Sequence, residues 1–137
     1  MGTVLVAVVL SLLMGFIGGF AAGMLTGPKA PAPQTRELWV FTVVLPFDDV
    51  IVGQPHDYFA PDQINVNKGD TVTIHFYNTE DEAETHTFTL DSPYTDNHSL
   101  NMGQNTTFTF TANAAGVFAY RCTLHQPTMT GYLVVNG

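Results

Sequence analysis

Residues 120–129 read YRCTLHQPTM and bring a thiol, an imidazole and a thioether into one short segment, those of Cys122, His125 and Met129. Cys122 is the only cysteine of the chain, which excludes an intramolecular disulfide, a four-cysteine zinc site and a cysteine-ligated iron–sulfur cluster. A thiolate, two imidazoles and a weak thioether form the ligand set of copper electron-transfer sites. This segment lacks one imidazole of that set, and we expect His86 to supply it.

Short runs that alternate between apolar and polar residues surround this segment, which is the pattern of half-buried β-strands. We expect strands over residues 39–45, 63–67, 71–77, 86–90, 106–111, 117–122 and 131–135. Turn residues separate these runs, so the sequence predicts an all-β fold, a β-sandwich of about seven or eight strands. The stretch from Asp91 to Met102, which contains His98, is predicted to be a loop.

The N-terminal part of the chain has a different composition. No charged residue lies between Thr3 and Thr26, and as a helix this run would span about 36 Å at ~1.5 Å per residue, enough to cross a bilayer core. We predict one transmembrane anchor over residues 1–27, a Pro/Ala linker over 28–36 and a folded domain over 37–137. A cleaved signal peptide is the alternative, but the run lacks a basic start and is longer than the usual apolar core of such peptides.

Three glycines recur at every fourth position of the predicted anchor, Gly15, Gly19 and Gly23. In a transmembrane helix they would line one face and let a second helix approach closely. This spacing is compatible with a homo-oligomer, and the equally weighted alternative is that small residues are simply common in such helices.

The folded part is strongly acidic. The chain has a formal charge of −8, and the part from Glu37 onward, with two basic and twelve acidic residues, carries −10. Nucleic acid is therefore excluded as an expected partner, because binding to phosphates needs a basic face. A protein with a basic docking surface is the partner that such a charge attracts.

The strand alternation places the candidate metal ligands on inward faces. His86 shares its face with Phe88, and Cys122 shares the corresponding face of its own strand with Tyr120. If these two strands are neighbours, His86 meets the loop that begins at Cys122 at one end of the sandwich. Two imidazoles, one thiolate and a weak axial thioether accommodate Cu(I) and Cu(II) similarly, so the pattern predicts one copper ion that cycles between these states.

The residues from about Glu37 to Gly137 resemble a cupredoxin. The resemblance is carried by NVNKGDTV at residues 65–72, THTF at 85–88 and AGVFAYRCTLH at 115–125. It implies a Greek-key β-sandwich, electron transfer as the task, and a type 1 copper site with the ligands His86, Cys122, His125 and, on the axis, Met129. The chain is also similar to nitrosocyanin and to the copper subunit of haem–copper oxidases. The dinuclear copper centre of that oxidase subunit needs two cysteines, and this chain has only Cys122, so the resemblance implies a site with one copper ion.

Two features depart from the cupredoxin pattern. Thr85 stands where many cupredoxins have an asparagine that joins the two ligand loops, which implies looser hydrogen bonding between them. An acidic run, Glu80-Asp81-Glu82 and Glu84, lies shortly before His86; we interpret it as a solvated loop. Nitrosocyanin uses a carboxylate ligand, so Glu84 stays open as an alternative ligand.

The sequence thus predicts a single-pass membrane protein whose copper domain faces the outside of the cytoplasmic membrane and carries single electrons to or from a redox partner protein. The alternative is a copper enzyme with an open coordination position that acts on a small molecule such as nitric oxide. This alternative applies if Met129 does not bind the metal.

The predicted anchor leads to a direct test. Full-length protein should partition with membranes and stay there through a high-salt wash, because an uncharged run from Thr3 to Thr26 inserts by the hydrophobic effect rather than by charge. Fractionation followed by intact-mass measurement checks this. A mature N-terminus beyond residue 20 would instead identify a cleaved signal peptide.

Overall fold

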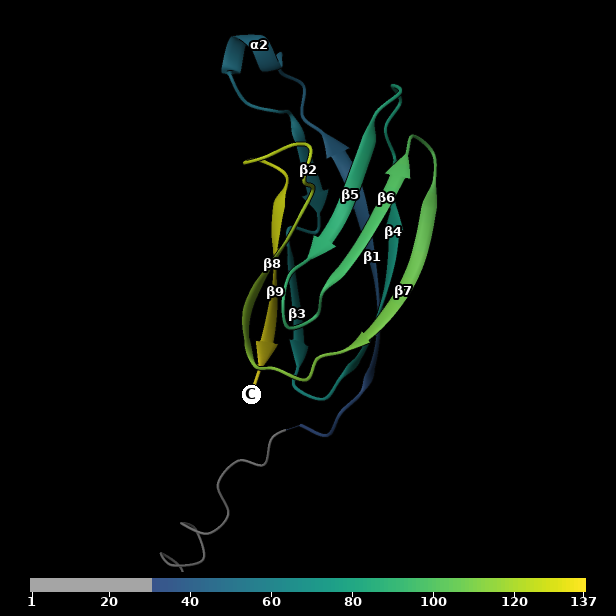
Figure 1. The fold of residues 1–137 in the computed structure, drawn as a ribbon, viewed down its shortest axis with the longest axis vertical. Helices are drawn as coiled ribbons and strands as arrows, with labels where there is room; N and C mark the ends of the chain where they lie inside the picture. Colours follow the sequence, from purple (N-terminus) through teal and green to yellow (C-terminus); the bar gives the residue numbers. More distant parts are fainter. Residues whose placement is uncertain (1–30) are drawn as a thin grey trace, which may run out of the picture. The chain divides into compact units, whose positions relative to one another are not determined.

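Nine strands form two sheets in the part of the chain that the computed structural model describes, residues 31–137. The strands are β1 (Thr35–Val44), β2 (Asp57–Ala60), β3 (Gln63–Asn67), β4 (Thr71–Tyr77), β5 (Thr85–Leu90), β6 (Asp96–Asn101), β7 (Asn105–Thr111), β8 (Gly116–Arg121) and β9 (Thr130–Asn136). One helical turn, α2 (Asp49–Val52), lies between β1 and β2. The two sheets face each other (Figure 1), which confirms the predicted all-β sandwich.

The sheets have the strand orders β2-β1-β4-β7 and β3-β9-β8-β5-β6. β1 runs parallel to β4 and β3 runs parallel to β9, and the other pairs are antiparallel. In the five-stranded sheet β5 pairs with β8, with Leu90 opposite Tyr120. The strands that were predicted to carry His86 and to lead into Cys122 are therefore neighbours, as the candidate site requires.

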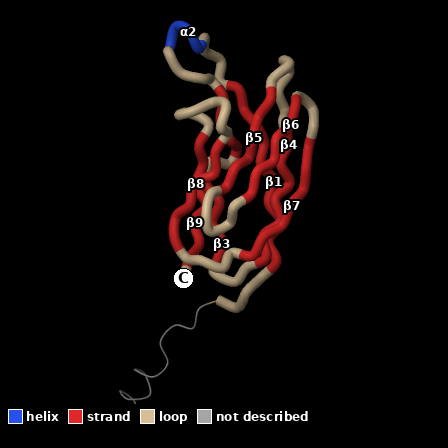
Figure 2. The backbone as a smooth tube through the Cα atoms, viewed as in Figure 1, coloured by secondary structure: helices blue, strands red, loops and turns tan. Residues whose placement is uncertain are grey.

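The prediction of a loop from Asp91 to Met102 was wrong, because β6 occupies Asp96–Asn101 and pairs with β5 along its whole length. Its sequence, DNHSLN, lacks the β-branched and aromatic residues that signal a strand. Backbone pairing with β5 and the burial of Leu100 hold it in place. Most of the described chain is strand (Figure 2). The sequence analysis also predicted no strand at the position of β2. β1 begins at Thr35, inside the linker predicted for residues 28–36.

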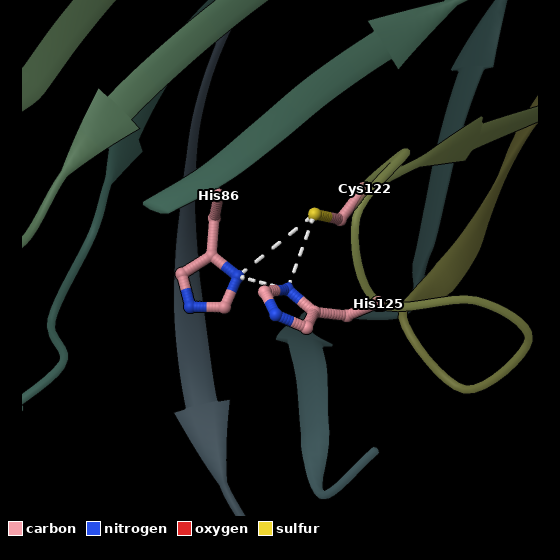
Figure 3. Close-up of side chains that lie close together, drawn as sticks. All are labelled: His86, Cys122 and His125. Atoms are coloured by element: carbon pink, nitrogen blue, oxygen red, sulfur yellow. Dashed lines mark hydrogen bonds between the residues drawn. The ribbon is translucent and has the colours of Figure 1, made fainter. Parts of the chain in front are cut away.

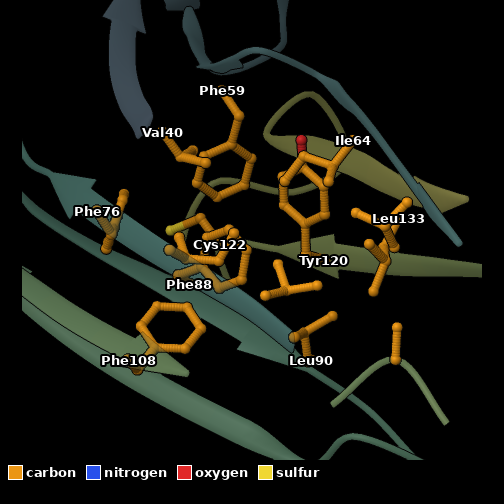
Figure 4. Close-up of a cluster of buried hydrophobic side chains, with 14 of the residues drawn as sticks. Val40, Phe59, Ile64, Phe76, Phe88, Leu90, Phe108, Tyr120, Cys122 and Leu133 are labelled. Carbon is orange, nitrogen blue, oxygen red and sulfur yellow. The ribbon is translucent and has the colours of Figure 1, made fainter. Parts of the chain in front are cut away.

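Aromatic rings form the centre of the core between the sheets (Figure 4). The ring of Phe88 stacks on Tyr120 at a centroid distance of 4.8 Å, and Phe59 contacts both rings edge-on or tilted, at 5.7 and 5.2 Å. Cys122 and Met129 belong to the same buried cluster. The candidate ligand loop therefore begins and ends on residues anchored in the core.

No helix within residues 31–137 is long and apolar enough to cross a membrane. The anchor predicted for residues 1–27 and the first part of the predicted linker, residues 28–30, lie outside the described residues.

The pairing of β8 with β9 yields a stability prediction. Gly131 lies opposite Tyr120, and a Cβ at this glycine would lie 2.2 Å from Cζ of that ring, which is fully buried and donates a hydrogen bond to the carbonyl of Pro61. Gly131→Ala should therefore destabilise the domain by about 1–3 kcal/mol or more, since an overpacked core must shift. Chemical denaturation measures this.

Gly137→Ala is the matched control for this test, because its added Cβ would lie 3.5 Å from Ala115, an ordinary contact. It should leave the unfolding midpoint unchanged. Equal midpoints for the Gly131→Ala variant and the unmodified protein would show that Tyr120 is not packed as described.

Candidate metal centre

Four segments that lie far apart in the sequence meet at the end of the sandwich that also carries α2 (Figure 1). They are the start of β5 with His86, the loop from Cys122 to Met129 between β8 and β9, the start of β2 with Asp57, and the connection between β4 and β5, residues 78–84. Loops at the ends of a rigid sheet are the usual place for functional side chains. Among the described residues, both groups of side chains that could hold a metal ion lie here: His86, Cys122 and His125, and Asp57, Glu80, Glu84 and His86.

His86, Cys122 and His125 converge on one point (Figure 3). The Nδ1 atoms of the two imidazoles lie 3.0 Å apart, and Sγ of Cys122 lies 3.9 Å from Nδ1 of His86 and 3.5 Å from Nδ1 of His125. A point equidistant from these three atoms is about 2.0 Å from each, close to the ~2.0–2.3 Å bonds that zinc makes to nitrogen and sulfur. The donor set therefore fits one transition-metal ion, and its soft thiolate with two imidazoles suits copper.

Thr87 joins the two loops that supply these ligands. Its backbone N–H donates to Sγ of Cys122 at 3.3 Å, and its hydroxyl oxygen accepts a 2.8 Å hydrogen bond from the backbone N–H of Thr123. Thr85, expected at the position that joins the loops, instead donates its hydroxyl to Asn101. Thr85 therefore does not join the two loops, and Thr87, the residue after His86, does so instead. The looser hydrogen bonding expected from Thr85 stays a prediction.

The ligand loop is closed by its own hydrogen bonds. The N–H of Met129 donates to the carbonyl of His125 at 3.0 Å, and the N–H of Cys122 donates to the carbonyl of Met129 at 3.0 Å. The side-chain amide of Gln126 donates to the carbonyls of Cys122 and Met129, at 2.7 and 2.9 Å. Met129, the predicted axial ligand, is fully buried at the end of this closed loop.

Carboxylates lie behind the two imidazoles, on the side away from Cys122. Oε1 of Glu80 is 3.1 Å from Nε2 of His86, and Oε1 of Glu84 is 2.8 Å from Nε2 of His125. Asp57 lies 3.9 Å from both Nε2 atoms. The interpretation of residues 80–84 as a solvated loop was wrong for Glu80, whose side chain is 2% exposed.

Burial shifts the pKa values of these groups. It raises the pKa of Asp57, an effect that the neighbouring His125 imidazole opposes, and it raises the pKa of Glu80. Burial also lowers the pKa of His86, which keeps this imidazole in the neutral form that a metal needs. Asp57 and Glu80 were missed from the sequence, because nothing in their local pattern distinguishes them from exposed acidic residues.

The other three histidines lie outside the candidate centre. His56 bonds to Asp49 at the start of α2. His75 stacks on Trp39 on the outer face of its sheet, and His98 stacks on Phe108. His98 was expected in a loop and instead lies on β6.

A family model for the cupredoxin-like domain matches residues 48–135. The chain therefore belongs to the cupredoxin-like family, which confirms the resemblance predicted from the sequence. No curated protein sequence matches the chain. The finer similarity to nitrosocyanin and to the copper subunit of haem–copper oxidases stays a prediction.

Solved structures share this fold. Copper nitrite reductase from Nitrosomonas europaea has a TM-score of 0.59 and 24% identity, over 74% of this chain and 41% of that chain. Auracyanin A, a "blue" copper protein from Chloroflexus aurantiacus, has a TM-score of 0.54 and 23% identity, over 74% of this chain and 99% of that chain. Auracyanin from Roseiflexus castenholzii has a TM-score of 0.52 and 19% identity, over 74% and 97%. The match thus spans about two fifths of the nitrite reductase chain and nearly all of each auracyanin.

Proposed function

We propose that this protein carries single electrons on one copper ion held by His86, Cys122 and His125, with Met129 as a weak axial ligand. The observation that carries the proposal is the convergence of Nδ1 of His86, Nδ1 of His125 and Sγ of Cys122 on one point. A copper ion bound there supplies a one-electron couple between Cu(I) and Cu(II). The closed ligand loop and the bond from Thr87 to Cys122 hold the donor atoms in place, so little rearrangement accompanies electron transfer.

His125 is the proposed point of electron exit and entry. Its side chain is 15% exposed, whereas His86 and Cys122 are fully buried. Its position at the end of the sandwich is one that a partner protein can approach. The formal charge of −10 from Glu37 onward favours a redox partner with a basic surface.

The uncharged run from Thr3 to Thr26 supports the further proposal of a single-pass anchor, with the copper domain on the outer side of the cytoplasmic membrane. Gly15, Gly19 and Gly23 support self-association through this anchor. Redox exchange would then take place close to the membrane surface.

The copper assignment predicts a colour. Purified full-length protein should bind one Cu(II) and show an intense thiolate-to-copper band in the visible, because Cys122 is the sole thiol within the donor set. Cys122→Ser should abolish the band. Titration followed by optical and paramagnetic-resonance spectroscopy measures both. Uptake of zinc without any coloured Cu(II) form, or a coloured Cys122→Ser variant, would remove the central claim.

The axial position separates the carrier from the alternative enzyme. Met129→Leu should raise the reduction potential while the visible band remains, because a distant thioether stabilises Cu(II) without belonging to the trigonal plane. Met102→Leu is the matched control, since Met102 is exposed and lies outside the ligand loop, and it should change neither property.

The opposite result would favour the enzyme. If Met129→Leu changes neither spectrum nor potential, and the unmodified protein binds azide or nitric oxide readily at copper, the coordination position is open. A reaction with a small molecule would then replace electron carriage as the proposed function.

A further inference from the structure

We propose that the acidic cluster behind the candidate copper centre is a second metal site, which binds one divalent cation of the Mn²⁺ type. Its ligands are the carboxylates of Asp57, Glu80 and Glu84 and atom Nε2 of His86. Copper would bind the other nitrogen of this ring, Nδ1, so the two ions use different donor atoms. The second site therefore goes beyond the proposed electron carriage and does not need copper to be bound.

The four donor atoms are close enough to share one ion. Each lies within 4.8 Å of the other three. Oε1 of Glu80 is 3.1 Å from Nε2 of His86, and Oδ1 of Asp57 is 3.9 Å from the same nitrogen. Ligands at about 2.0–2.2 Å from a metal ion lie about 3–4 Å from one another, so a small inward movement closes the site. Glu84 also approaches Nε2 of His125 to 2.8 Å, and because its side chain is 34% exposed it can turn toward the ion.

Three of the four donors are buried polar atoms that the protein leaves unsatisfied. The side chains of Asp57, Glu80 and His86 are 1%, 2% and 0% exposed. Within residues 31–137, Oδ1 of Asp57, Oε1 of Glu80 and Nε2 of His86 have no hydrogen-bond partner. The short approach of Glu80 to His86 is therefore not a hydrogen bond. A buried polar atom without a partner is costly, and one cation would satisfy all three atoms.

No basic side chain balances the charge of the cluster. Among the described residues, the arginines that form ion pairs, Arg36 and Arg121, pair with Asp70 and Asp91. No lysine or arginine of this part of the chain forms an ion pair with the cluster carboxylates. Buried charges in proteins are either paired or bound to metals, so the missing positive charge points to a cation.

A pocket of about 390 Å³ gives a cation a route from solvent to the cluster. The acidic residues that line it are Asp48, Glu80, Asp81, Glu82 and Glu84. Carboxylates around one opening attract cations and repel anions. Glu80 and Glu84 belong to both the pocket and the cluster, so an ion that enters the pocket meets the proposed ligands directly.

The donor chemistry separates the two metal sites. Three carboxylates and one imidazole suit Mn²⁺, whereas the thiolate of Cys122 with two imidazoles suits copper. Mn²⁺ is also the weakest-binding ion of the first-row series, which keeps it out of the copper centre in an experiment. When copper already occupies Nδ1 of His86, the second ion binds Nε2 after the remaining ring proton has passed to solvent.

A Mn²⁺ titration of copper-free full-length protein tests the site. The paramagnetic-resonance signal of free Mn²⁺ should be lost until one ion is bound per chain, and the bound ion should show coupling to one nitrogen. Glu80→Gln should lower the affinity by about tenfold or more, because affinity for such cations depends on the number of charged ligands. Absence of the nitrogen coupling would overturn the assignment of His86 as a ligand.

Glu82→Gln is the matched control. Glu82 lines the same pocket but lies outside the donor cluster, so this variant should bind Mn²⁺ as the unmodified protein does. Glu84→Gln is the second test variant, because its partly exposed side chain can be changed with little effect on folding, and it should also weaken Mn²⁺ binding.

Unfolding midpoints distinguish a metal ligand from a residue that only supports the fold. A ligand that binds only the folded state stabilises it, so Mn²⁺ should raise the midpoint of the unmodified protein and of Glu82→Gln. It should raise that of Glu80→Gln much less. Without Mn²⁺, Glu80→Gln should be at least as stable as the unmodified protein, because it removes one of several like charges. A large loss of stability in metal-free Glu80→Gln would instead show a structural role and overturn the proposal.

Three further results would overturn the second site. One is that the unmodified protein binds no Mn²⁺. Another is an equal loss of affinity in Glu80→Gln and Glu82→Gln, which would show attraction by overall charge alone. The third is loss of Mn²⁺ binding in Cys122→Ser, which would place the ion in the copper centre. None of these results changes the visible band that tests the copper assignment, so the two proposals can fail separately.

Discussion

The contact between Thr87 and the segment that begins at Cys122 is the constraint on which the candidate centre depends. The N–H of Thr87 donates to Sγ of Cys122, and the hydroxyl of Thr87 accepts from the N–H of Thr123. Both bonds are buried or partly buried, so breaking either would leave a polar group without a partner. They join β5 to the loop after β8, and this places His86 and His125 on the same side of one sulfur atom.

The rest of the sandwich holds that contact rigid. Phe88 follows Thr87 by one residue on β5, and Tyr120 precedes Cys122 by two residues; their rings stack in the core. The loop between Cys122 and Met129 is closed at its base by backbone bonds and by Gln126. A closely packed interior resists small displacements, so the donor atoms keep their arrangement without a metal having to organise them.

Much of this could be predicted from the sequence, because the signals are local. Alternation at period two in residues such as 71–77 identified most strands, and a single cysteine close to a histidine and a methionine identified the metal chemistry. The inward position of His86 also followed from its neighbours along the strand. β6 could not be predicted, because its polar residues form a strand only through pairing with β5.

By itself, the sequence determined the sandwich class, the soft donor types and the acidic character of the domain, since these depend on composition and on spacing along the chain. Only the tertiary structure decided which side chains surround the centre. Thr87 replaced Thr85 as the link between the loops, and Glu80 proved buried against His86. The physical reason is that burial and hydrogen bonding arise between segments that lie far apart in the sequence. Thr87 on β5 and Cys122 after β8, for example, are 35 residues apart, and no local sequence pattern predicts their contact.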